Sequence, residues 1–527
     1  MNTSNRAERF DVPTERPLTY RPLTLEAGLR AAAGRAPQKV ALSDGTRELT
    51  YMALIDRIDR LSNAARSGAG LRRGDHAAIL APNCLEYPEV IAGLGAAGAA
   101  TATISERSSV AEIEFICNDA EVRLLVVHPD LEEKVRSAVL DKVDHIVVLG
   151  DEYEMWIESA SSTPLGLGIE EWEPMSIPYT SGTTGRPKGV VVSHRSRTLN
   201  YLAMSVEYGC YSSEDRSLAV APLYHGAGLS FALAPIFFGG FCEIVPHFDP
   251  EYVLSRLSEQ SITNVFMVPT HFSSIFALSS ETLAALQPRD LKCIISNASP
   301  LSQVMKERIV EYFGEGLLFE CYGSTEGGVV SNLRPYDQLR KERCVGLPFP
   351  GTEIELIGED GEPVNTGEIG EILSLSPYLF NEYWRLPEQT ASVIRDGWYA
   401  SGDLAYQDDE GYLYIVDRKN DMIISGGINV FPREVEEALL RHPAVLEAAV
   451  YGVPDEHWGD AVWASVVLRD GMTVTTEDVL ESCHTLSRYK RPKHLEFLPT
   501  LPRNNAGKVL RRVLRDVAKE TLTSTGQ

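Results

Sequence analysis

The chain has 527 residues, of which 44% are hydrophobic and 23% charged, a composition typical of a globular protein with more than one domain. The formal net charge of −25 argues against binding to nucleic acid or to an anionic membrane, because both need a basic protein surface. The most apolar run, residues 90–104, is shorter than the roughly 20 residues of a membrane-spanning helix. It is predicted to be a packed helix that leads into a strand.

The remaining global features predict a cytoplasmic protein. The polar start of the chain and its end, "TSTGQ", carry no targeting or lipidation signal. The eight cysteines show neither C-x-x-C pairs nor metal-ligand spacing, so we expect reduced structural thiols. Monomer and homodimer both stay open.

The first third of the chain contains three short apolar segments with helical stretches around them, at residues 76–83, 123–128 and 144–150. Strands that alternate with helices indicate βαβ units and a mostly parallel sheet. These segments therefore predict a first α/β layer.

Residues 179–190, "YTSGTTGRPKGV", combine three glycines, four Ser or Thr hydroxyls and one lysine. Backbone N–H groups made accessible by glycine, together with hydroxyls and a lysine, suit the oxygens of a polyphosphate. The segment is not a Walker A loop, because Pro187 precedes Lys188 and Gly189 follows it. A donor-rich turn from Thr180 to Gly185 is predicted; a flexible loop between two strands is the structural alternative.

Five further apolar segments alternate with helical stretches at residues 216–225, 240–247, 263–269, 291–300 and 316–326. They predict a second parallel sheet, so the chain is expected to contain two α/β subdomains.

After residue 343 the pattern changes to antiparallel strands joined by Gly- and Asp-rich turns, at residues 352–377 and 404–417. A new unit follows, in which Pro432 suits a first helical turn and Val435, Leu439 and Leu440 are expected along one helix face. A hinge near Lys419 and Asn420 would divide the chain into domains 1–419 and 420–527.

Four more motifs join residues 179–190: "CYGSTEGG" (321–328), "YASGDLA" (399–405), "DRKNDMIISGGINVFP" (417–432) and "LPRNNAGKVLRR" (501–512). In this order and spacing they closely resemble the adenylate-forming superfamily, which comprises acyl-CoA synthetases, peptide-synthetase adenylation domains and firefly-type luciferases. The resemblance covers residues 25–515. It implies an α/β fold with a large N-terminal domain, built from two α/β subdomains and a small β region, and a small mobile α+β C-terminal domain.

The resemblance also implies ATP and Mg²⁺, with Lys508 as the lysine that stabilises the transition state and Glu326 as the metal ligand. Thr325 would contact phosphate, Tyr322 would stack on adenine, and Asp403 would bind the ribose hydroxyls. The full set implied to contact ATP or AMP is Thr180, Ser181, Gly182, Thr183, Thr184, Gly185, Lys188, Asn297, Ala298, Ser299, Glu320, Cys321, Tyr322, Gly323, Thr325, Asp403, Arg418 and Lys508.

The second half-reaction of the family needs a thiol, and CoA is expected as co-substrate. The family implies a pantetheine tunnel along "SGGIN", and the basic run "RYKRPK" suits the phosphates of CoA, although a solvated basic face is the alternative. The expected CoA-binding residues are Gly426, Gly427, Trp458, Tyr489, Lys490, Arg491 and Lys493, with Arg488 beside them.

The acid pocket is expected to be largely apolar. His225 resembles the family's aromatic gate, and a histidine packed behind a strand end is its structural alternative. The residues expected to line the pocket are Tyr224, His225, Phe231, Ala298, Gly323, Gly328 and Val329. No Arg or Lys stands among them, so a monocarboxylic acid, medium-chain or aryl, is predicted.

Three positions depart from the family pattern. Asn420 occupies a hinge position that is usually Asp or Lys, and His247 occupies a position near the nucleotide that is Lys or Arg in several CoA ligases. "SNASPLS" replaces the commoner double-glycine start. It adds bulk near the adenine or the acid.

The leading hypothesis is an acid:CoA ligase that releases AMP and pyrophosphate. An adenylation enzyme that loads a carrier protein is the first alternative; an amino-acid substrate is disfavoured, because no acidic residue lies between Pro222 and Ala234 to bind an amine. Luciferase-like oxidation and a catalytically silent nucleotide-binding protein are weaker hypotheses. The chain keeps the family residues Lys508, Glu326 and Asp403, which argues against a catalytically silent protein.

Overall fold

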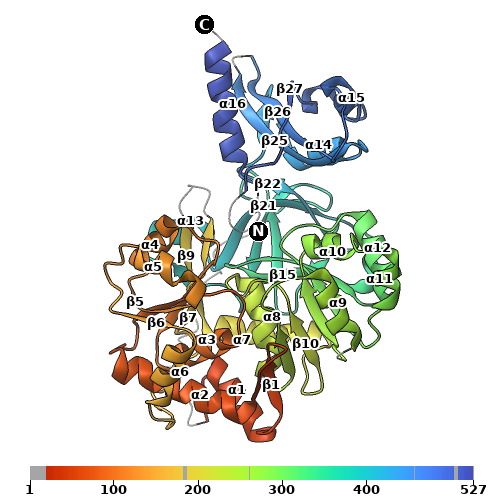
Figure 1. Cartoon of the computed structure of the whole chain (residues 1–527). Helices are drawn as coiled ribbons and strands as arrows, with labels where there is room; N and C mark the ends of the chain where they lie inside the picture. The colour runs from red at the N-terminus through yellow and green to blue at the C-terminus, as the bar shows by residue number, and fades with distance from the viewer. Residues whose placement is uncertain (1–18, 182–186, 260, 456, 504–508, 526–527) are drawn as a thin grey trace, which may run out of the picture.

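The computed structural model of the chain describes residues 19–181, 187–259, 261–455, 457–503 and 509–525. These residues form a large N-terminal part with three β-sheets and a small C-terminal part with a fourth sheet (Figure 1). The predicted fold class, two α/β subdomains with a small β region and a smaller α+β domain, is confirmed.

The first subdomain contains an eight-stranded sheet in the order β19-β9-β7-β4-β3-β5-β6, with β8 paired to β9. Its strands are β3 (His76–Leu80), β4 (Ala100–Ile104), β5 (Val122–Val127), β6 (His145–Val148), β7 (Pro174–Ser176), β8 (Tyr179–Ser181), β9 (Pro187–Ser193) and β19 (Glu382–Tyr383). The three segments predicted as strands are confirmed as β3, β5 and β6, which pair in parallel.

Helices connect the strands of this sheet. They are α3 (Glu86–Ala96), α4 (Val110–Asp119), α5 (Glu132–Arg136), α6 (Asp151–Glu158) and, after β19, α13 (Pro387–Val393). The run 90–104 is α3 leading into β4, as predicted. α4 begins at a capping box, in which the Ser109 hydroxyl accepts from the Glu112 N–H and the Glu112 carboxylate accepts from the Ser109 N–H.

The second subdomain contains a nine-stranded sheet in the order β16-β15-β14-β13-β12-β10-β11-β1-β2. Its strands are β1 (Val40–Ser43), β2 (Glu48–Thr50), β10 (Arg216–Ala219), β11 (Phe241–Ile244), β12 (Asn264–Met267), β13 (Cys293–Ser296), β14 (Leu318–Ser324), β15 (Gly328–Leu333) and β16 (Leu347–Pro348). Strands β10 to β14 are parallel and match the five predicted segments.

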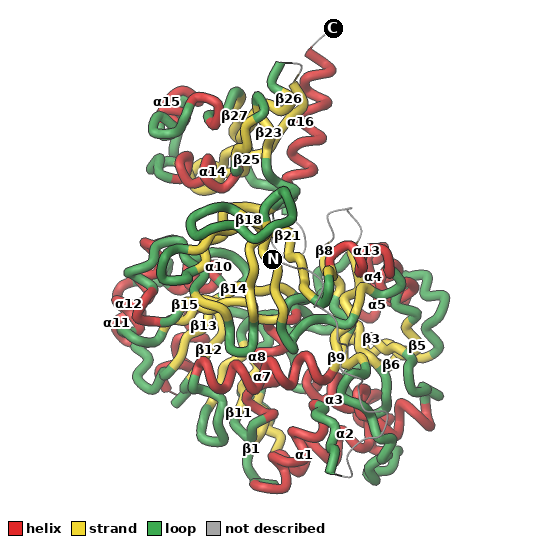
Figure 2. The backbone as a smooth tube through the Cα atoms, turned by 180° about the vertical axis from the view of Figure 1, so that it is seen from behind, coloured by secondary structure: helices red, strands yellow, loops and turns green. Residues whose placement is uncertain are grey.

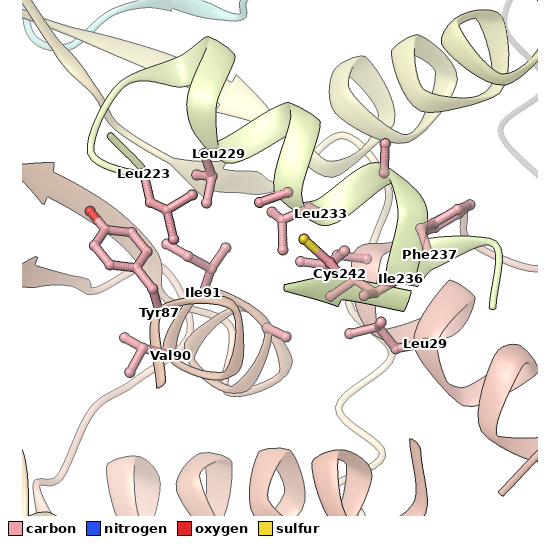
Figure 3. Packing of buried hydrophobic residues seen from close by; sticks show 14 of the residues in the cluster. Leu29, Tyr87, Val90, Ile91, Leu223, Leu229, Leu233, Ile236, Phe237 and Cys242 are labelled. Carbon is pink, nitrogen blue, oxygen red and sulfur yellow. The ribbon is translucent and has the colours of Figure 1, made fainter. Parts of the chain in front are cut away.

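The helices around this sheet are α1 (Leu25–Arg35), α2 (Tyr51–Asn63), α7 (His194–Tyr208), α8 (Gly226–Phe237), α9 (Pro250–Glu259), α10 (Pro269–Ile275), α11 (Ser280–Ala285) and α12 (Gln303–Phe313). α8 lies centrally in the N-terminal part and is buried from Gly228 to Phe237 (Figure 1). Figure 3 shows Leu223, Leu229 and Leu233 turned toward Tyr87 and Ile91 of α3. This packing fixes the start of α8, where the candidate site begins.

The third and fourth sheets are small. The third contains β17 (Glu353–Ile357), β18 (Gly370–Leu375), β20 (Ile394–Arg395), β21 (Trp398–Gln407) and β22 (Leu413–Arg418), all antiparallel. The fourth contains β23 (Ile423–Ser425), β24 (Ile428–Val430), β25 (Val445–Asp455), β26 (Gly459–Leu468) and β27 (His494–Phe497), with helices α14 (Pro432–Leu440), α15 (Thr476–Glu481) and α16 (Arg511–Thr525) around it. Seen from behind in Figure 2, the fourth sheet and its helices lie at one end of the molecule, next to β18 and β21.

The turn between β22 and β23 contains Lys419 and Asn420, so the chain passes from the third sheet to the fourth where the hinge was predicted. That this turn works as a hinge stays a prediction. Contacts that join the parts in this arrangement include the Arg433 N–H, which donates to Asp417 Oδ2 at 2.9 Å, and Arg343, which pairs with Glu437.

One expectation about α14 was wrong. Val435 and Leu439 are buried as predicted, but Leu440 is 44% exposed and Ala438 takes the inner position. At 100° per residue, position 440 lies about 140° away from position 435 around the helix, which turns Leu440 to solvent.

All eight cysteines are free thiols, and seven of them are buried. Across the described ranges, we find no helix that combines the length and the apolarity required to cross a bilayer.

Candidate active site

The candidate residues of the N-terminal part gather at the carboxyl edge of the nine-stranded sheet. Tyr224 and His225 follow β10, Asn297 to Ser299 follow β13, and Thr325 and Glu326 follow β14. Since parallel strands end at one edge of a sheet, the loops after them meet there, and ligands of α/β proteins bind at this edge.

Tyr322, Asp403 and Arg418 are joined by a hydrogen bond and an ion pair at this edge. The Tyr322 hydroxyl donates to Asp403 Oδ2 at 2.5 Å, and Arg418 Nε lies 3.3 Å from Asp403 Oδ1. Asp403 and Arg418 are direct partners across β21 and β22, and Tyr322 reaches them from β14. Burial and the neighbouring Asp403 carboxylate raise the pKa of Tyr322 well above its usual value, so the phenol stays a donor.

The Thr325–Glu326 turn is held by three neighbours. Arg197 donates to the Thr325 carbonyl at 2.7 Å, the Phe380 N–H donates to the Glu326 carbonyl at 2.8 Å, and the Tyr383 hydroxyl donates to Glu326 Oε1 at 2.9 Å. The turn therefore has a fixed backbone and one oriented carboxylate.

Lys188 contacts the tyrosine that holds Glu326: its Nζ lies 4.9 Å from the centre of the Tyr383 ring. Thr180 pairs with Lys188 and Ser181 with Pro187 across the β8–β9 hairpin, so the strands flanking the predicted phosphate turn are in place. Gly182, Thr183, Thr184, Gly185 and Lys508 lie outside the described residues, and their roles stay predictions.

The loop after β13 reaches β14 next to Tyr322. Asn297 Nδ2 donates to Cys321 Sγ at 3.1 Å, while Ala298 and Ser299 are exposed. The side chain of Glu320 is engaged elsewhere: it pairs with buried Lys306 at 2.5 Å and accepts from the Leu301 N–H at 3.0 Å. Any contact from Glu320 to a nucleotide therefore runs through its backbone.

Ala298 has a φ of +76°, in the left-handed region where a Cβ costs about 1–2 kcal/mol. We therefore expect Ala298→Gly to raise the free energy of unfolding by up to about 1 kcal/mol, part of the relief being offset by the greater chain entropy of glycine. Urea titration measures the change. Ala284→Gly, in α11, is the control and should lower stability, because glycine weakens a helix; two changes of the same sign would contradict the strain at Ala298.

Most acid-pocket candidates lie on α8, β14 and β15 or directly before α8. Phe231 stacks on Phe266 with ring centres 4.1 Å apart, and Tyr224 and His225 have ring centres 4.5 Å apart. Gly323 and Gly328 face each other across the β14–β15 turn, where a Cβ on Gly323 would lie 2.1 Å from the Gly328 carbonyl oxygen. Val329 is buried beside them. Ala298 is exposed, and that these residues line one acid pocket stays a prediction.

Burial lowers the pKa of His194, His225 and His271 from 6.5 to about 4. Such a histidine takes up a proton on unfolding at a pH between the two values. The free energy of unfolding is therefore expected to fall as the pH drops from about 6.5 toward 4, with no contribution from these groups at higher pH. Urea midpoints at pH 7.5, 6 and 5 would measure it. In His194→Gln the fall should be smaller, and an equal slope in variant and wild type would show that His194 titrates normally.

The CoA candidates are only partly brought together. The Gly426 N–H donates to the Trp458 carbonyl at 2.7 Å, and Lys493 Nζ lies 4.7 Å from the centre of the Trp458 ring. Gly426 and Gly427 both have positive φ and form the two-residue turn between β23 and β24, which by itself favours glycine.

The basic run divides among different partners. Lys490 pairs with Glu434 at 2.7 Å and lies 5.9 Å from the Tyr489 ring centre, while Arg491 donates to the carbonyls of His484 and Leu486. Lys493 is therefore the member of the run that lies beside Trp458.

Arg197 and Tyr383 were missed by the sequence analysis. Arg197 is only 5% exposed, and burial lowers its pKa below the usual value. One signal was available: Arg197 shares a face of α7 with Tyr201, Met204 and Tyr208, which are all buried. Tyr383 lies on a two-residue strand that no periodicity reveals.

Glu326 fits the magnesium that the resemblance implies. Among the described residues no group of three or more His, Cys, Asp or Glu side chains could hold a metal. Mg²⁺ in nucleotide sites is commonly bound through one or two carboxylates together with substrate phosphates, and one oriented carboxylate is what the turn offers.

Comparisons with known proteins agree with this geometry. Residues 29–384 match the family model described as AMP-binding enzyme, and residues 434–508 match its C-terminal domain. A feruloyl-CoA synthase of Amycolatopsis sp is 36% identical over 488 residues, which cover 92% of this chain and 96% of the relative. A long-chain-fatty-acid–CoA ligase of Escherichia coli O157:H7 is 32% identical over 550 residues, covering 97% of each chain.

The crystal structure of ATP-bound MatB from Rhodopseudomonas palustris superposes with a TM-score of 0.86 at 29% identity, covering 95% of this chain and 100% of that one. The family models together span most of the chain, and the relatives are similar over nearly their whole length. The chain therefore belongs to the AMP-binding enzyme family of adenylate-forming enzymes, in its acyl-CoA synthetase branch, and is an AMP-forming acid–thiol ligase.

Proposed function

We propose that this ligase joins an aryl or medium-chain monocarboxylic acid to ATP as an acyl-adenylate and then transfers the acyl group to CoA. The observation that carries this proposal is the convergence at one sheet edge of Tyr322, Asp403 and Arg418 with the Thr325–Glu326 turn. The first group presents a carboxylate to a ribose, and the turn presents donors and a carboxylate to phosphate and metal. Both half-reactions then use one site.

In the first half-reaction an oxygen of the acid attacks the α-phosphorus of ATP, and the bond to pyrophosphate breaks. Asp403 would bind the ribose hydroxyls, and Lys188 would face the leaving phosphates. Lys508 would stabilise the charge that develops between them. Glu326 would hold Mg²⁺, which supplies positive charge to the phosphate oxygens.

An aryl acid is favoured over an aliphatic one. The Phe231 ring stacks on Phe266 with ring centres 4.1 Å apart, and its centre lies 6.3 Å from that of Tyr208. Aromatic rings pack well against a flat aromatic ligand. The feruloyl-CoA synthase relative, at 36% identity, also supports this choice over the fatty-acid ligase relative at 32%.

The acceptor is proposed to be CoA. In the second half-reaction the CoA sulfur attacks the acyl carbon and AMP leaves. The Gly426 turn, Trp458 and Lys493 form a contiguous surface on the C-terminal part that could face the CoA nucleotide. Rotation about Lys419 and Asn420 would bring it to the site. Loading of a carrier protein is the competing function.

A screen of acids with ATP, Mg²⁺ and either CoA or pantetheine tests this proposal. Substituted cinnamates and benzoates should form thioesters faster than octanoate, and CoA should be used much better than pantetheine. Lys493→Glu should raise the KM for CoA, whereas Arg491→Glu, whose guanidinium is engaged by backbone carbonyls, should raise it less. Equal use of pantetheine and CoA would favour the carrier-loading alternative.

A further inference from the structure

The first turn of α8 is a free helix N-terminus that points into the candidate site. The helix has 12 residues, no side chain caps it at His225, and no acidic residue lies in its first turn. The N–H groups of the first turn of a helix have no partner within the helix and carry partial positive charge, so they attract anions.

Arg197 is a buried cation beside this helix end. Its side chain is 5% exposed, and its hydrogen bond to the Thr325 carbonyl uses one of five guanidinium N–H donors. Within the described ranges no carboxylate lies within 4.0 Å of the guanidinium. A buried cation without an anion in contact is costly, which suggests that an anionic group completes this site when substrate binds.

Thr325 joins the two features. Its carbonyl accepts from Arg197, and its Oγ1 lies 3.6 Å from the position that a Cβ on Gly226 would occupy. Glu326 is next in the chain and attracts the Arg197 charge through space, but its Oε1 accepts from Tyr383. The donors of Arg197 and of the α8 first turn therefore remain available to a ligand.

We propose that Arg197 and the first turn of α8, Gly226 to Gly228, bind the carboxylate of the acid before it is adenylated. This inference rests on the proposed function and deepens it. The acid and ATP are both anionic, and the protein carries a net charge of −25, so bringing them together requires local positive charge.

Arg197 would hold the carboxylate during adenylation without taking part in bond formation. One carboxylate oxygen forms the bond to the α-phosphorus while the bond to pyrophosphate breaks, and Arg197 stays protonated throughout. Once the acid is joined to AMP as a mixed anhydride, it no longer carries a carboxylate charge. The contribution of Arg197 should therefore end with the first half-reaction.

This inference also revises the acid pocket. The pocket was predicted to contain no Arg or Lys, yet Arg197 lies beside the turn that borders it. If Arg197 instead met a second carboxylate, at the far end of a dicarboxylic acid, the chain would prefer dicarboxylic substrates. Variants of Arg197, assayed with monocarboxylic and with dicarboxylic acids, distinguish these two positions of the carboxylate.

The test compares Arg197→Met and Arg197→Lys with Arg195→Met. Arg195 lies on the same helix, pairs with Glu171 and is half exposed, so its variant controls for the loss of one charge from α7. In the Arg197→Met enzyme we expect the KM for cinnamate in ATP–pyrophosphate exchange to rise roughly 10- to 100-fold, as for a lost hydrogen bond to a charged group. The KM for ATP and the rate of thioester formation from preformed cinnamoyl-AMP should change less than about threefold on the same reasoning.

Arg197→Lys should recover part of the loss, because the charge remains, and millimolar guanidinium ion should partly rescue Arg197→Ala. If Arg197 only supported the fold, neither the lysine substitution nor added guanidinium ion would restore the KM for the acid. Equal losses with cinnamate and with preformed cinnamoyl-AMP would overturn the proposal, and a loss confined to dicarboxylic acids would assign Arg197 to a distal carboxylate and overturn it too.

Direct binding separates failure of this inference from failure of the proposed function. Without ATP, the wild-type protein should bind cinnamate about tenfold more tightly than cinnamamide, whose reacting group is neutral. Arg197→Met should abolish this preference while Arg195→Met keeps it. If no acid forms an adenylate but this preference exists, the anion site stands and the proposed reaction falls; if adenylates form without the preference, the anion site falls alone.

Discussion

Lys508→Ala is expected to lower the rate of acyl-adenylate formation by roughly 10²–10³-fold, the usual cost of removing one preorganised charge that acts on the transition state. The motif "NNAGKVL" places this lysine where the adenylate-forming enzymes carry the lysine that reaches the carboxylate and the α-phosphate. By this resemblance, its charge is expected to act while pyrophosphate leaves.

The second half-reaction should behave differently. Thioester formation from preformed acyl-adenylate breaks the bond between the acyl carbon and AMP, and the charge developing on pyrophosphate is no longer involved. ATP–pyrophosphate exchange measures the first step, and CoA thioester formation from synthetic acyl-adenylate measures the second. Parallel losses in both steps would show that Lys508 serves the fold or both reactions.

Arg512→Ala is the matched control for this experiment. Arg512 lies four residues further along, is mostly exposed, and is 3.9 Å from Asp516 on the same helix. Its removal takes one positive charge from the end of the same motif and leaves the segment "NNAGKVL" around Lys508 unchanged. Both half-reactions should retain most of their rate in this variant.

The strands of both large sheets could be predicted because short apolar runs separated by helical stretches carry a strong signal. β5 and β12 are buried along most of their length, so their sequences are almost continuously apolar. The candidate site could be predicted only by resemblance: the motifs lie in loops, and no periodicity places Thr325 next to Gly226 or Asp403 next to Tyr322.

The basic run "RYKRPK" shows why neighbours in sequence need not be neighbours in function. Residues 488–490 form a single 3₁₀ turn, and Pro492 separates Arg491 from Lys493. Lys490 is thereby directed to Glu434 and Lys493 to Trp458. Charge counting along the chain suggested one cluster, whereas the backbone divides it.

Arg195 and Arg197 show that nearby residues of one type can differ in burial. The segment "HRSR" suggests an exposed helix start, since arginine is rarely buried. In the structure the adjacent Arg195 is half exposed and Arg197 is buried, because two positions differ by 200° around a helix. The function of a buried charge depends on what surrounds it, and the sequence of α7 alone does not contain that information.

Asp403→Ala is expected to reduce kcat/KM for ATP by at least roughly 100-fold, because a hydrogen bond to a charged group contributes about 1.5–3 kcal/mol and two ribose hydroxyls would lose their acceptor. Asp403 is buried to 9% exposure between Tyr322 and Arg418, so its carboxylate has a single orientation. The effect should appear with every acid tested, since the acid does not contact this residue.

Tyr322→Phe separates the ribose contact from the network that orients it. The variant removes the 2.5 Å hydrogen bond to Asp403 Oδ2 but leaves the carboxylate and the Arg418 pair at 3.3 Å. We expect a loss of roughly 5- to 10-fold in kcat/KM for ATP, the value of one hydrogen bond that only positions the acceptor. In the double variant the two losses should not add, because Tyr322 would then have no carboxylate left to orient. Fully additive losses would mean that Tyr322 and Asp403 bind the nucleotide independently, which the short contact between them argues against.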